Sequence, residues 1–129
     1  MTSLKGLSIL VADDELELRD IMMESLAYSG AAVVGVANGA EAWAELNKRS
    51  FDVVLSDIRM PGGDGVELVK RISSELQVKP ILFLITGFSD LSLQEAQKYG
   101  VIEIFNKPFS MKNIIQIVAD SAAKKHEAA

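Results

Sequence analysis

Five reactive side chains each follow an apolar run of this 129-residue sequence. Asp13 and Asp14 follow the first run, Asp57 the third, Thr86 the fourth and Lys107 the fifth. Two carboxylates about 4 Å apart repel each other by about 4 kcal/mol at an effective dielectric of about 20, so three acids in one cleft need a cation. Carboxylate oxygens suit a hard cation that keeps bound water. We therefore predict a site for Mg²⁺, with Mn²⁺ as the alternative.

The same groups suit the transfer of a phosphoryl group to a carboxylate. A metal ion that bridges a carboxylate and a phosphoryl oxygen neutralises charge during in-line displacement. Lys107 would pair with one phosphoryl oxygen as a point charge, and the Thr86 hydroxyl would donate a hydrogen bond to another. These roles require the five residues to lie together in the fold.

Each of these residues, taken alone, has a simpler explanation. Asp14 could cap a helix, because aspartate is a favoured N-cap residue. Asp57 could be a turn residue, Thr86 could be a turn or cap hydroxyl, and Lys107 could be a solvated surface charge. A shared site is favoured because each of these residues closely follows one of the apolar runs that recur along the chain.

That pattern begins with short, β-branched apolar runs bounded by Asp, Gly, Pro or Asn. Most runs are apolar at successive positions, which is typical of strands buried on both faces of a parallel sheet. The expected strands are Leu7–Ala12, Ala31–Val36, Phe51–Ser56, Pro80–Ile85 and Val101–Phe105.

Segments with helical spacing lie between these runs and after the last one. The first of them stops at Gly30, and serines begin the last two, as expected for helix ends and caps. The expected helices, with their inward residues, are Glu15–Ser29 (Leu18, Ile21, Met22, Leu26), Gly39–Lys48 (Ala40, Trp43, Ala44, Leu46), Gly65–Leu76 (Val66, Val69, Ile72), Ser89–Tyr99, and a last helix capped by Ser110 (Ile114, Ile117, Val118, Ser121).

The chain is therefore a strand and a helix repeated five times. This order predicts an α/β fold with right-handed crossovers and a three-layer sandwich around a parallel sheet. We expect one domain over residues 1–123 and a polar tail over residues 124–129. Ligands of such folds bind at the carboxyl ends of the strands, which is where the five reactive residues fall.

The composition argues against several other classes of protein. Without cysteine there is neither a disulfide framework nor a thiolate metal site, and the one histidine, His126, falls in the polar tail. A net charge of −5 argues against direct binding of nucleic acid. No apolar run reaches the roughly 20 residues that span a membrane, and the first residues lack a signal-peptide pattern, so we expect a cytoplasmic location.

The motifs at the strand ends, taken together, resemble those of the response regulator receiver family of two-component signalling. The resemblance runs from about Leu7 to Ala122 and implies a flavodoxin-like fold with sheet order 2-1-3-4-5. The matching segments, in the family's order and spacing, are Ile9–Asp14, Val53–Gly62, Asp64–Gly65, Ile85–Gly87 and Lys107–Phe109.

The resemblance implies a phosphorylation-dependent switch that catalyses only its own phosphorylation and dephosphorylation. A sensor histidine kinase or a phosphotransfer protein would donate the phosphoryl group, and Asp57 would accept it. Asp14, Asp57 and the main-chain carbonyl of Arg59 would bind Mg²⁺ directly, and Asp13 would act through metal-bound water.

The resemblance also implies which residues would contact the phosphoryl group. Lys107, aimed into the pocket by a cis peptide bond to Pro108, would pair with it. Thr86 would move to donate a hydrogen bond to it. Arg59 and Phe88 would flank it and slow its hydrolysis, the alternative being that both side chains point to solvent.

Two positions depart from the family pattern. Gly63 replaces a large apolar residue, which would leave its loop more mobile. Ile104 replaces the aromatic ring that forms the family's switch together with Thr86. Phe105 cannot stand in for that ring, because successive side chains of a strand point to opposite faces. We therefore expect the loop 86–90 and the start of the fourth helix to carry the signal, the alternative being a weakly coupled switch.

The expected output surface joins the fourth and fifth helices. It would comprise Leu91, Glu95 and Lys98 with Met111 and Ile115, and it would contact an unidentified downstream protein or a second phosphorylated copy. No output domain follows the last helix, so we expect a stand-alone receiver or one cut from a longer regulator.

Three alternatives stay open. A degenerate receiver would bind partners without being phosphorylated. A haloacid-dehalogenase-type phosphatase would place its two acids two residues apart after the first strand, whereas Asp13 and Asp14 are adjacent. A flavodoxin would need a hydroxyl-rich phosphate loop at that point, where three successive acids would repel phosphate.

Overall fold

Five parallel strands form one sheet in a computed structural model that describes residues 2–87 and 91–128. The strand order is β2-β1-β3-β4-β5, which confirms the predicted α/β fold and sheet order. The strands are β1 Ser8–Ala12, β2 Ala32–Val36, β3 Val53–Asp57, β4 Ile81–Thr86 and β5 Val101–Asn106.

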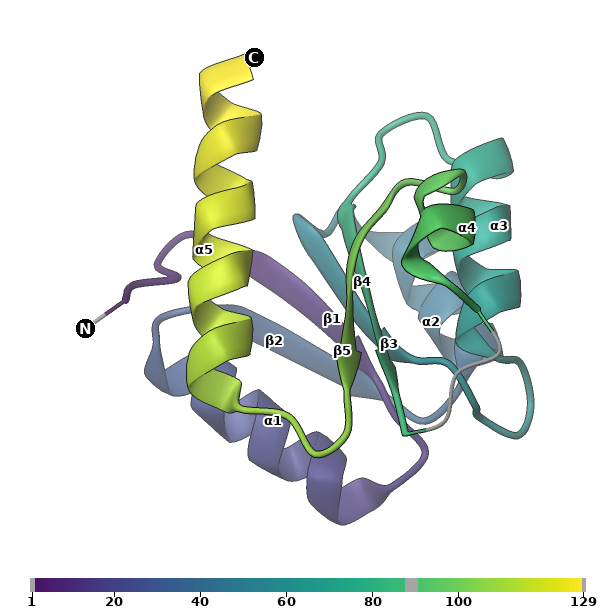
Figure 1. Ribbon diagram of the computed structural model, residues 1–129, viewed down its shortest axis with the longest axis horizontal. Helices are drawn as coiled ribbons and strands as arrows, with labels where there is room; N and C mark the ends of the chain where they lie inside the picture. The colour runs from purple at the N-terminus through teal and green to yellow at the C-terminus, as the bar shows by residue number, and fades with distance from the viewer. Residues whose placement is uncertain (1, 88–90, 129) are drawn as a thin grey trace.

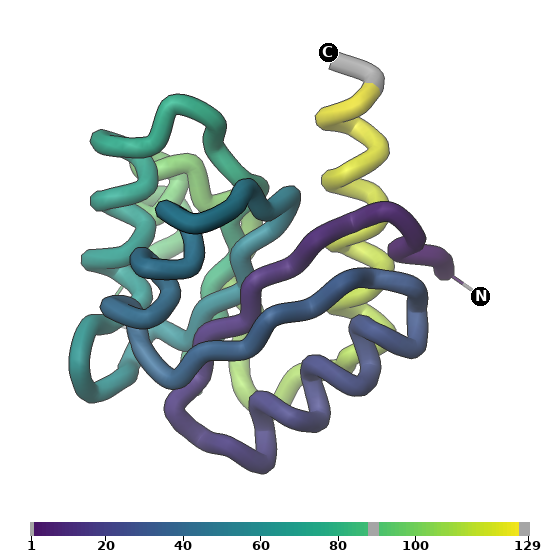
Figure 2. The backbone as a smooth tube through the Cα atoms, turned by 180° about the vertical axis from the view of Figure 1, so that it is seen from behind, coloured from purple at the N-terminus to yellow at the C-terminus, as the bar shows by residue number. Residues whose placement is uncertain are grey.

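Helices cover both faces of the sheet, as the three-layer prediction requires. One face carries α1 and α5, and the other carries α2, α3 and α4 (Figure 1). The view from behind shows the same division (Figure 2). The helices are α1 Leu16–Tyr28, α2 Gly39–Lys48, α3 Gly65–Glu75, α4 Leu93–Gln97 and α5 Met111–Ala128.

Each face of the sheet has its own hydrophobic core. Along β3, Val54 joins the core under α2 and α3, whereas its neighbours Val53 and Leu55 join the core under α1 and α5. Every residue of β3 and β4 is buried, which explains why these strands are apolar at successive positions. The two cores therefore hold the sheet firmly and fix the positions of the residues at the carboxyl ends of its strands.

The central strand β3 is bonded on both sides, to β1 and to β4. Asp57 lies opposite Ile85 in this register, and the next amide, of Ile58, donates to the Ile85 carbonyl at 2.9 Å. The pairing of β4 with β5 is less regular, with a register shift between Leu82 and Phe83.

Two predicted helix faces need correction. In α1, Met22 and Leu26 are buried but Ile21 is 54% exposed. In α2, Ala42 and Leu46 are buried. Of the residues that we expected to face inward on α2, Ala40 and Ala44 are exposed, as the burial pattern shows.

The fourth helix is shorter than predicted and begins later. Ser92 is its N-cap, and the Ser92 hydroxyl accepts a hydrogen bond from the Glu95 amide at 3.1 Å. Ser89, the expected cap, lies outside the described residues. The fifth helix continues to Ala128, so the polar end of the chain is helical. Within the described residues, no helix is long and apolar enough to cross a membrane.

Candidate functional site

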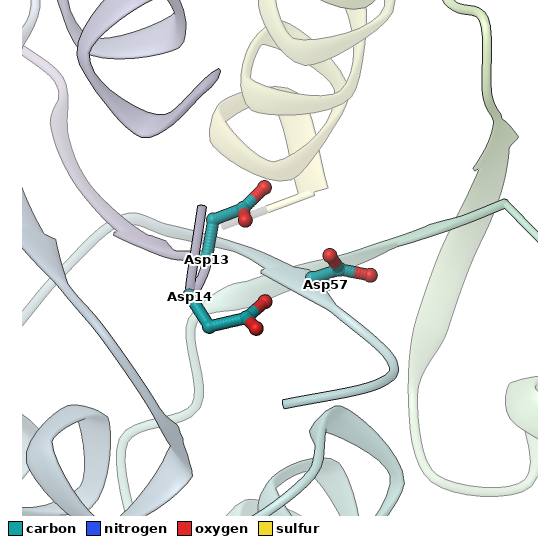
Figure 3. A group of neighbouring side chains, drawn as sticks. All are labelled: Asp13, Asp14 and Asp57. Carbon is teal, nitrogen blue, oxygen red and sulfur yellow. The ribbon is translucent and has the colours of Figure 1, made fainter. Parts of the chain in front are cut away.

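Three carboxylates meet at the carboxyl edge of the sheet. Asp13 and Asp14 directly follow β1, and Asp57 ends the neighbouring strand β3. One carboxylate oxygen of each residue lies within 4.8 Å of the other two (Figure 3). The parallel register of β1 and β3 therefore brings together the three acids that the sequence placed at strand ends.

Asp13 is the most constrained of these acids. Its side chain is fully buried, and its Oδ1 accepts a hydrogen bond from the Glu15 amide at 2.9 Å. Its Oδ2 is buried without a hydrogen-bond partner among the described residues. Burial and, to a smaller degree, the charge of Asp57 raise the pKa of the Asp13 carboxyl above its ordinary value.

Lys107 supplies the positive charge of the site. Its Nζ donates to Asp57 Oδ2 at 2.9 Å, and it lies 3.5 Å from Glu15 Oε1. Burial acts to lower the pKa of Lys107. The hydrogen bond to Asp57 and the charges of Asp57, Asp13 and Glu15 outweigh that effect, so the pKa of Lys107 is raised. Sequence reasoning did not assign Glu15 to the site, although it is the third acid of the run after β1.

Thr86 ends β4 and is 2% exposed. Its carbonyl accepts a hydrogen bond from the Lys107 amide at 2.7 Å, so the two residues are linked through the backbone. The peptide bond between Lys107 and Pro108 is cis, which confirms that prediction. Gly87 lies against the aliphatic part of Lys107, because a Cβ built on Gly87 would meet the Lys107 Cδ at 3.6 Å.

The loop from β3 to α3 is held at both ends by backbone contacts. The Gly65 amide donates to the Ile58 carbonyl at 2.8 Å, and the Gly39 amide of α2 donates to the Gly63 carbonyl at 2.8 Å. Gly63 has a φ of 122°, a conformation that favours glycine. Arg59 lies in this loop with its side chain exposed, as the burial pattern shows.

The acid cluster fits a hard divalent cation. Three carboxylates lie close together, and the buried Oδ2 of Asp13 has no hydrogen-bond partner among the residues described. A buried acceptor without a donor is costly, and a cation or its bound water satisfies it. The donors are all oxygens, as Mg²⁺ prefers.

The residues expected to transmit a signal do not form one surface. Ile104 is partly buried and packs against the core under α2, α3 and α4. Leu91 and Glu95 line a hollow together with Ile104. Met111 and Ile115 instead line a groove beside α1, so the structure groups them with α1 and the output surface stays a prediction. Phe88 lies outside the described residues.

Comparisons with known proteins agree with this geometry. The model of the response regulator receiver domain matches residues 9–119. The chain is 34% identical over 111 residues to the DNA-binding transcriptional regulator NtrC of Escherichia coli, a match that covers 85% of this chain and 24% of NtrC. It is 37% identical over 123 residues to the transcriptional regulatory protein FixJ of Bradyrhizobium diazoefficiens, which covers 94% of this chain and 58% of FixJ. The chain thus spans about a quarter of one relative and somewhat more than half of the other.

The fold is also that of a solved receiver. The crystal structure of a CheY-like response regulator receiver domain protein from Methanospirillum hungatei superposes with a TM-score of 0.86 at 23% identity, covering 98% of this chain and 100% of that one. The chain is therefore a member of the response regulator receiver family, rather than a haloacid-dehalogenase-type phosphatase or a flavodoxin.

Proposed function

We propose that this receiver takes a phosphoryl group onto Asp57 from a sensor histidine kinase or a phosphotransfer protein. The observation that carries the proposal is the position of Asp57. It is the one acid of the cluster whose carboxylate the Lys107 amine contacts, at 2.9 Å. It also belongs to the central strand, so the surrounding sheet fixes its direction.

In the proposed transfer, an oxygen of the Asp57 carboxylate attacks phosphorus as the bond from phosphorus to the donor's imidazole nitrogen breaks. The imidazole leaves with the electron pair of that bond, and an acyl phosphate remains on Asp57. Lys107 stabilises the charge that develops on the phosphoryl oxygens, because its ammonium group already lies beside the attacking carboxylate. Hydrolysis by water later returns the free aspartate.

Asp14, Asp57 and the main-chain carbonyl of Arg59 are the proposed direct ligands of Mg²⁺, with Asp13 acting through bound water. When bound, Mg²⁺ supplies positive charge to the transferring phosphoryl oxygens. The unpartnered Oδ2 of Asp13 supports this assignment, since it gives a metal-bound water an acceptor.

After transfer, we propose that the Thr86 hydroxyl donates a hydrogen bond to the phosphoryl group. Thr86 is buried at the end of β4, so this contact requires the following loop to move inward. Ile104 already packs against the core, which leaves the loop 86–90 and the start of α4 as the carriers of the signal.

We place this chemistry in the cytoplasm, where a sensor kinase would present its phosphohistidine. Both relatives described above are transcriptional regulators by name. We propose that the receiver acts on transcription through another segment or protein, because its own net charge of −5 disfavours contact with nucleic acid.

The proposal is tested by incubating the protein with acetyl phosphate and Mg²⁺ and measuring its intact mass. We expect an adduct of about 80 Da, the mass that one phosphoryl group adds on transfer. It should be absent with a chelator and in Asp57→Asn. Asp20→Asn, which changes an exposed acid on α1, is the matched control and should retain the adduct. An unmodified wild-type protein would support the degenerate receiver instead, and an adduct that survives Asp57→Asn would reject Asp57 as the acceptor.

A further inference from the structure

The side chain of Arg19 reaches back from α1 to the loop that follows β1. Its Nη1 donates a hydrogen bond of 2.7 Å to the main-chain carbonyl of Asp13, six residues earlier in the chain. The residue is partly buried, and among the described residues it makes no ion pair. Arginine is well suited to pairing with carboxylates, yet here the guanidinium binds the backbone next to the acid cluster.

The carbonyl that Arg19 binds belongs to the peptide unit that joins Asp13 to Asp14. A peptide unit is planar, so a hydrogen bond that fixes its carbonyl also fixes the direction in which both residues leave it. The carboxylates of both residues lie close to that of Asp57 (Figure 3). The position of this one peptide unit therefore affects two of the three acids that would surround a cation.

The two acids differ in how firmly they are held. The Asp13 amide donates to the Val36 carbonyl at 3.1 Å, and the Asp13 Oδ1 accepts a hydrogen bond from the Glu15 amide. Asp14 is exposed, and within the described part of the chain its side chain makes no hydrogen bond or ion pair. Asp14 therefore depends for its position on the preceding peptide unit, which Arg19 holds.

Gly35 on β2 makes room for this contact. A Cβ built on Gly35 would clash with the Met23 Sδ and would lie 3.3 Å from the Arg19 Cδ, so both side chains lie directly over this glycine. Met23 also packs against the core under α1 and α5, which gives Arg19 a firm apolar neighbour. A glycine inside a strand often marks such a close approach. The Arg19 side chain is thus confined, which favours one direction for its guanidinium.

We propose that Arg19 is a positioning residue for the metal site, because it holds the peptide unit between Asp13 and Asp14. The inference rests on the Mg²⁺ site proposed above and concerns a residue that binds neither the ion nor the phosphoryl group. Arg19 has two effects of opposite sign on a bound cation. Its charge repels the cation, whereas the placement of Asp14 favours binding. The sign of the change on substitution therefore separates the two effects.

Isothermal titration calorimetry of Mg²⁺ binding measures that sign. Arg19→Met keeps an apolar stem but removes the donor and the charge. We expect it to weaken Mg²⁺ binding about tenfold, the low end of the loss typical when a group that orients a metal ligand is removed. Arg19→Lys should recover part of the loss. Lysine also restores the repelling charge, so this recovery can come only from the hydrogen bond. Arg49→Met, which removes an exposed arginine at the end of α2, is the matched control and should bind Mg²⁺ like the wild type.

Gly35→Ala tests the same contact from the other side. The added Cβ pushes Met23 and Arg19 away from β2, so we expect weaker Mg²⁺ binding in this variant too. The effect should largely vanish in the Arg19→Met background, because the contact that Gly35 protects is already lost there. Equal effects in both backgrounds would contradict the role given to Gly35.

Hydrogen exchange of the metal-free protein tests the loop directly. Arg19→Met should speed exchange of the Asp13 and Glu15 amides, whose hydrogen bonds belong to the same loop, and leave amides in the middle of β1 unchanged. Unchanged exchange in the loop would overturn the proposal. A wild type that binds Mg²⁺ no more tightly than Arg19→Met would overturn this proposal alone. A wild type that binds no Mg²⁺ would overturn it together with the metal site.

Discussion

Ile104 and Phe105 are neighbours on β5 but belong to different cores. Ile104 packs against the core under α2, α3 and α4, whereas Phe105 is buried in the opposite core, 5.7 Å from Phe83 between ring centroids. The aromatic residue next to the switch position therefore cannot rotate into the space beside Thr86. The switch position itself is occupied by a side chain that is already partly buried.

We predict that phosphorylation changes the loop after β4 more than it changes Ile104. Amide spectra with and without beryllofluoride should show their largest shifts in the acid pocket and within residues 86–98. Ile104→Ala should lower the free energy of unfolding by about 1 kcal/mol, as expected for truncating a partly buried side chain, and leave the α4 shifts in place. If the dominant change is a rearrangement of Ile104, the side chain carries the signal and this prediction is wrong.

Asp13→Asn should stabilise the metal-free protein at neutral pH by about 1–2 kcal/mol, because it removes a buried charge that lacks a full set of donors. The pKa of Asp13 is raised in the folded state from an ordinary value of 3.8. The folded protein therefore holds this proton more tightly than the unfolded chain does. Asp13 accordingly costs stability as pH rises above 3.8 and through its folded pKa.

Urea unfolding in a chelator, for wild type and Asp13→Asn across this pH range, measures the effect. The difference between the two proteins should be small at the acid end and grow toward neutrality. Adding Mg²⁺ should stabilise the wild type more than the variant. A variant that is less stable than the wild type at neutral pH would show that the Glu15 amide bond outweighs the buried charge.

Lys107→Ala should have opposite effects on metal binding and on phosphoryl transfer. Lys107 is the cation that offsets the acid cluster in the metal-free protein, and its loss removes a competitor for the carboxylates. We expect Mg²⁺ to bind several-fold more tightly by calorimetry. We expect transfer from acetyl phosphate to slow by about tenfold or more, since a charge beside the transferring group is lost. Lys48→Ala on α2 is the surface control. If Lys107→Ala changed the Mg²⁺ affinity and the transfer rate in the same direction, the roles assigned to Lys107 would be wrong.

Gly65 and Gly87 should respond very differently to alanine. A Cβ at Gly65 would clash with the backbone carbonyl of Asp57 and lie 3.1 Å from the Ile58 Cα, so we expect a loss of about 2–4 kcal/mol in stability. Among the residues that the structure describes, a Cβ at Gly87 would make only ordinary contacts, with Lys107. Gly87→Ala should therefore change the stability of the metal-free protein by less than about 0.5 kcal/mol. Thermal unfolding of both variants distinguishes these cases.

Arg59→Ala should shorten the lifetime of the phosphorylated state several-fold. Arg59 is two residues beyond Asp57, and its long side chain is exposed, as the burial pattern shows. The decay of the mass adduct after removal of acetyl phosphate measures this lifetime. Unchanged decay would mean that the Arg59 side chain does not hinder the attacking water.

The sequence was sufficient to predict the strands and the acid cluster, because both depend on strong local signals. Continuous apolar runs mark buried strands, and the acids follow those runs directly. The sheet order came from the family resemblance, since periodicity does not determine which strands pair. The position of Asp57 beside the acids of β1 depends on that order.

The errors have local physical causes. The buried face of α1 is narrow, following Met22 and Leu26, and Ile21 lies about 100° around the helix from Met22. The N-cap of α4 was assigned to Ser89 instead of Ser92, because the two serines lie only three residues apart. The pattern from Ser92 to Glu95 is that of a capping box and would have identified the correct one. The surface around α5 could not be predicted, because it depends on how α5 crosses α1.

The pairing of β3 on both sides has a mechanical consequence for Asp57. A residue in a strand that is bonded on both sides is held firmly in place, so a chemical change there must displace its neighbours instead. On one side lie the acids that follow β1, and on the other the hydroxyl that ends β4. Beyond β4 the sheet is bonded through an irregular register to the edge strand β5. Deformation of the sheet after a chemical change at Asp57 should therefore spread toward β5. Amide protons of β3 should be among the last to exchange with solvent, whether or not Asp57 carries a phosphoryl group.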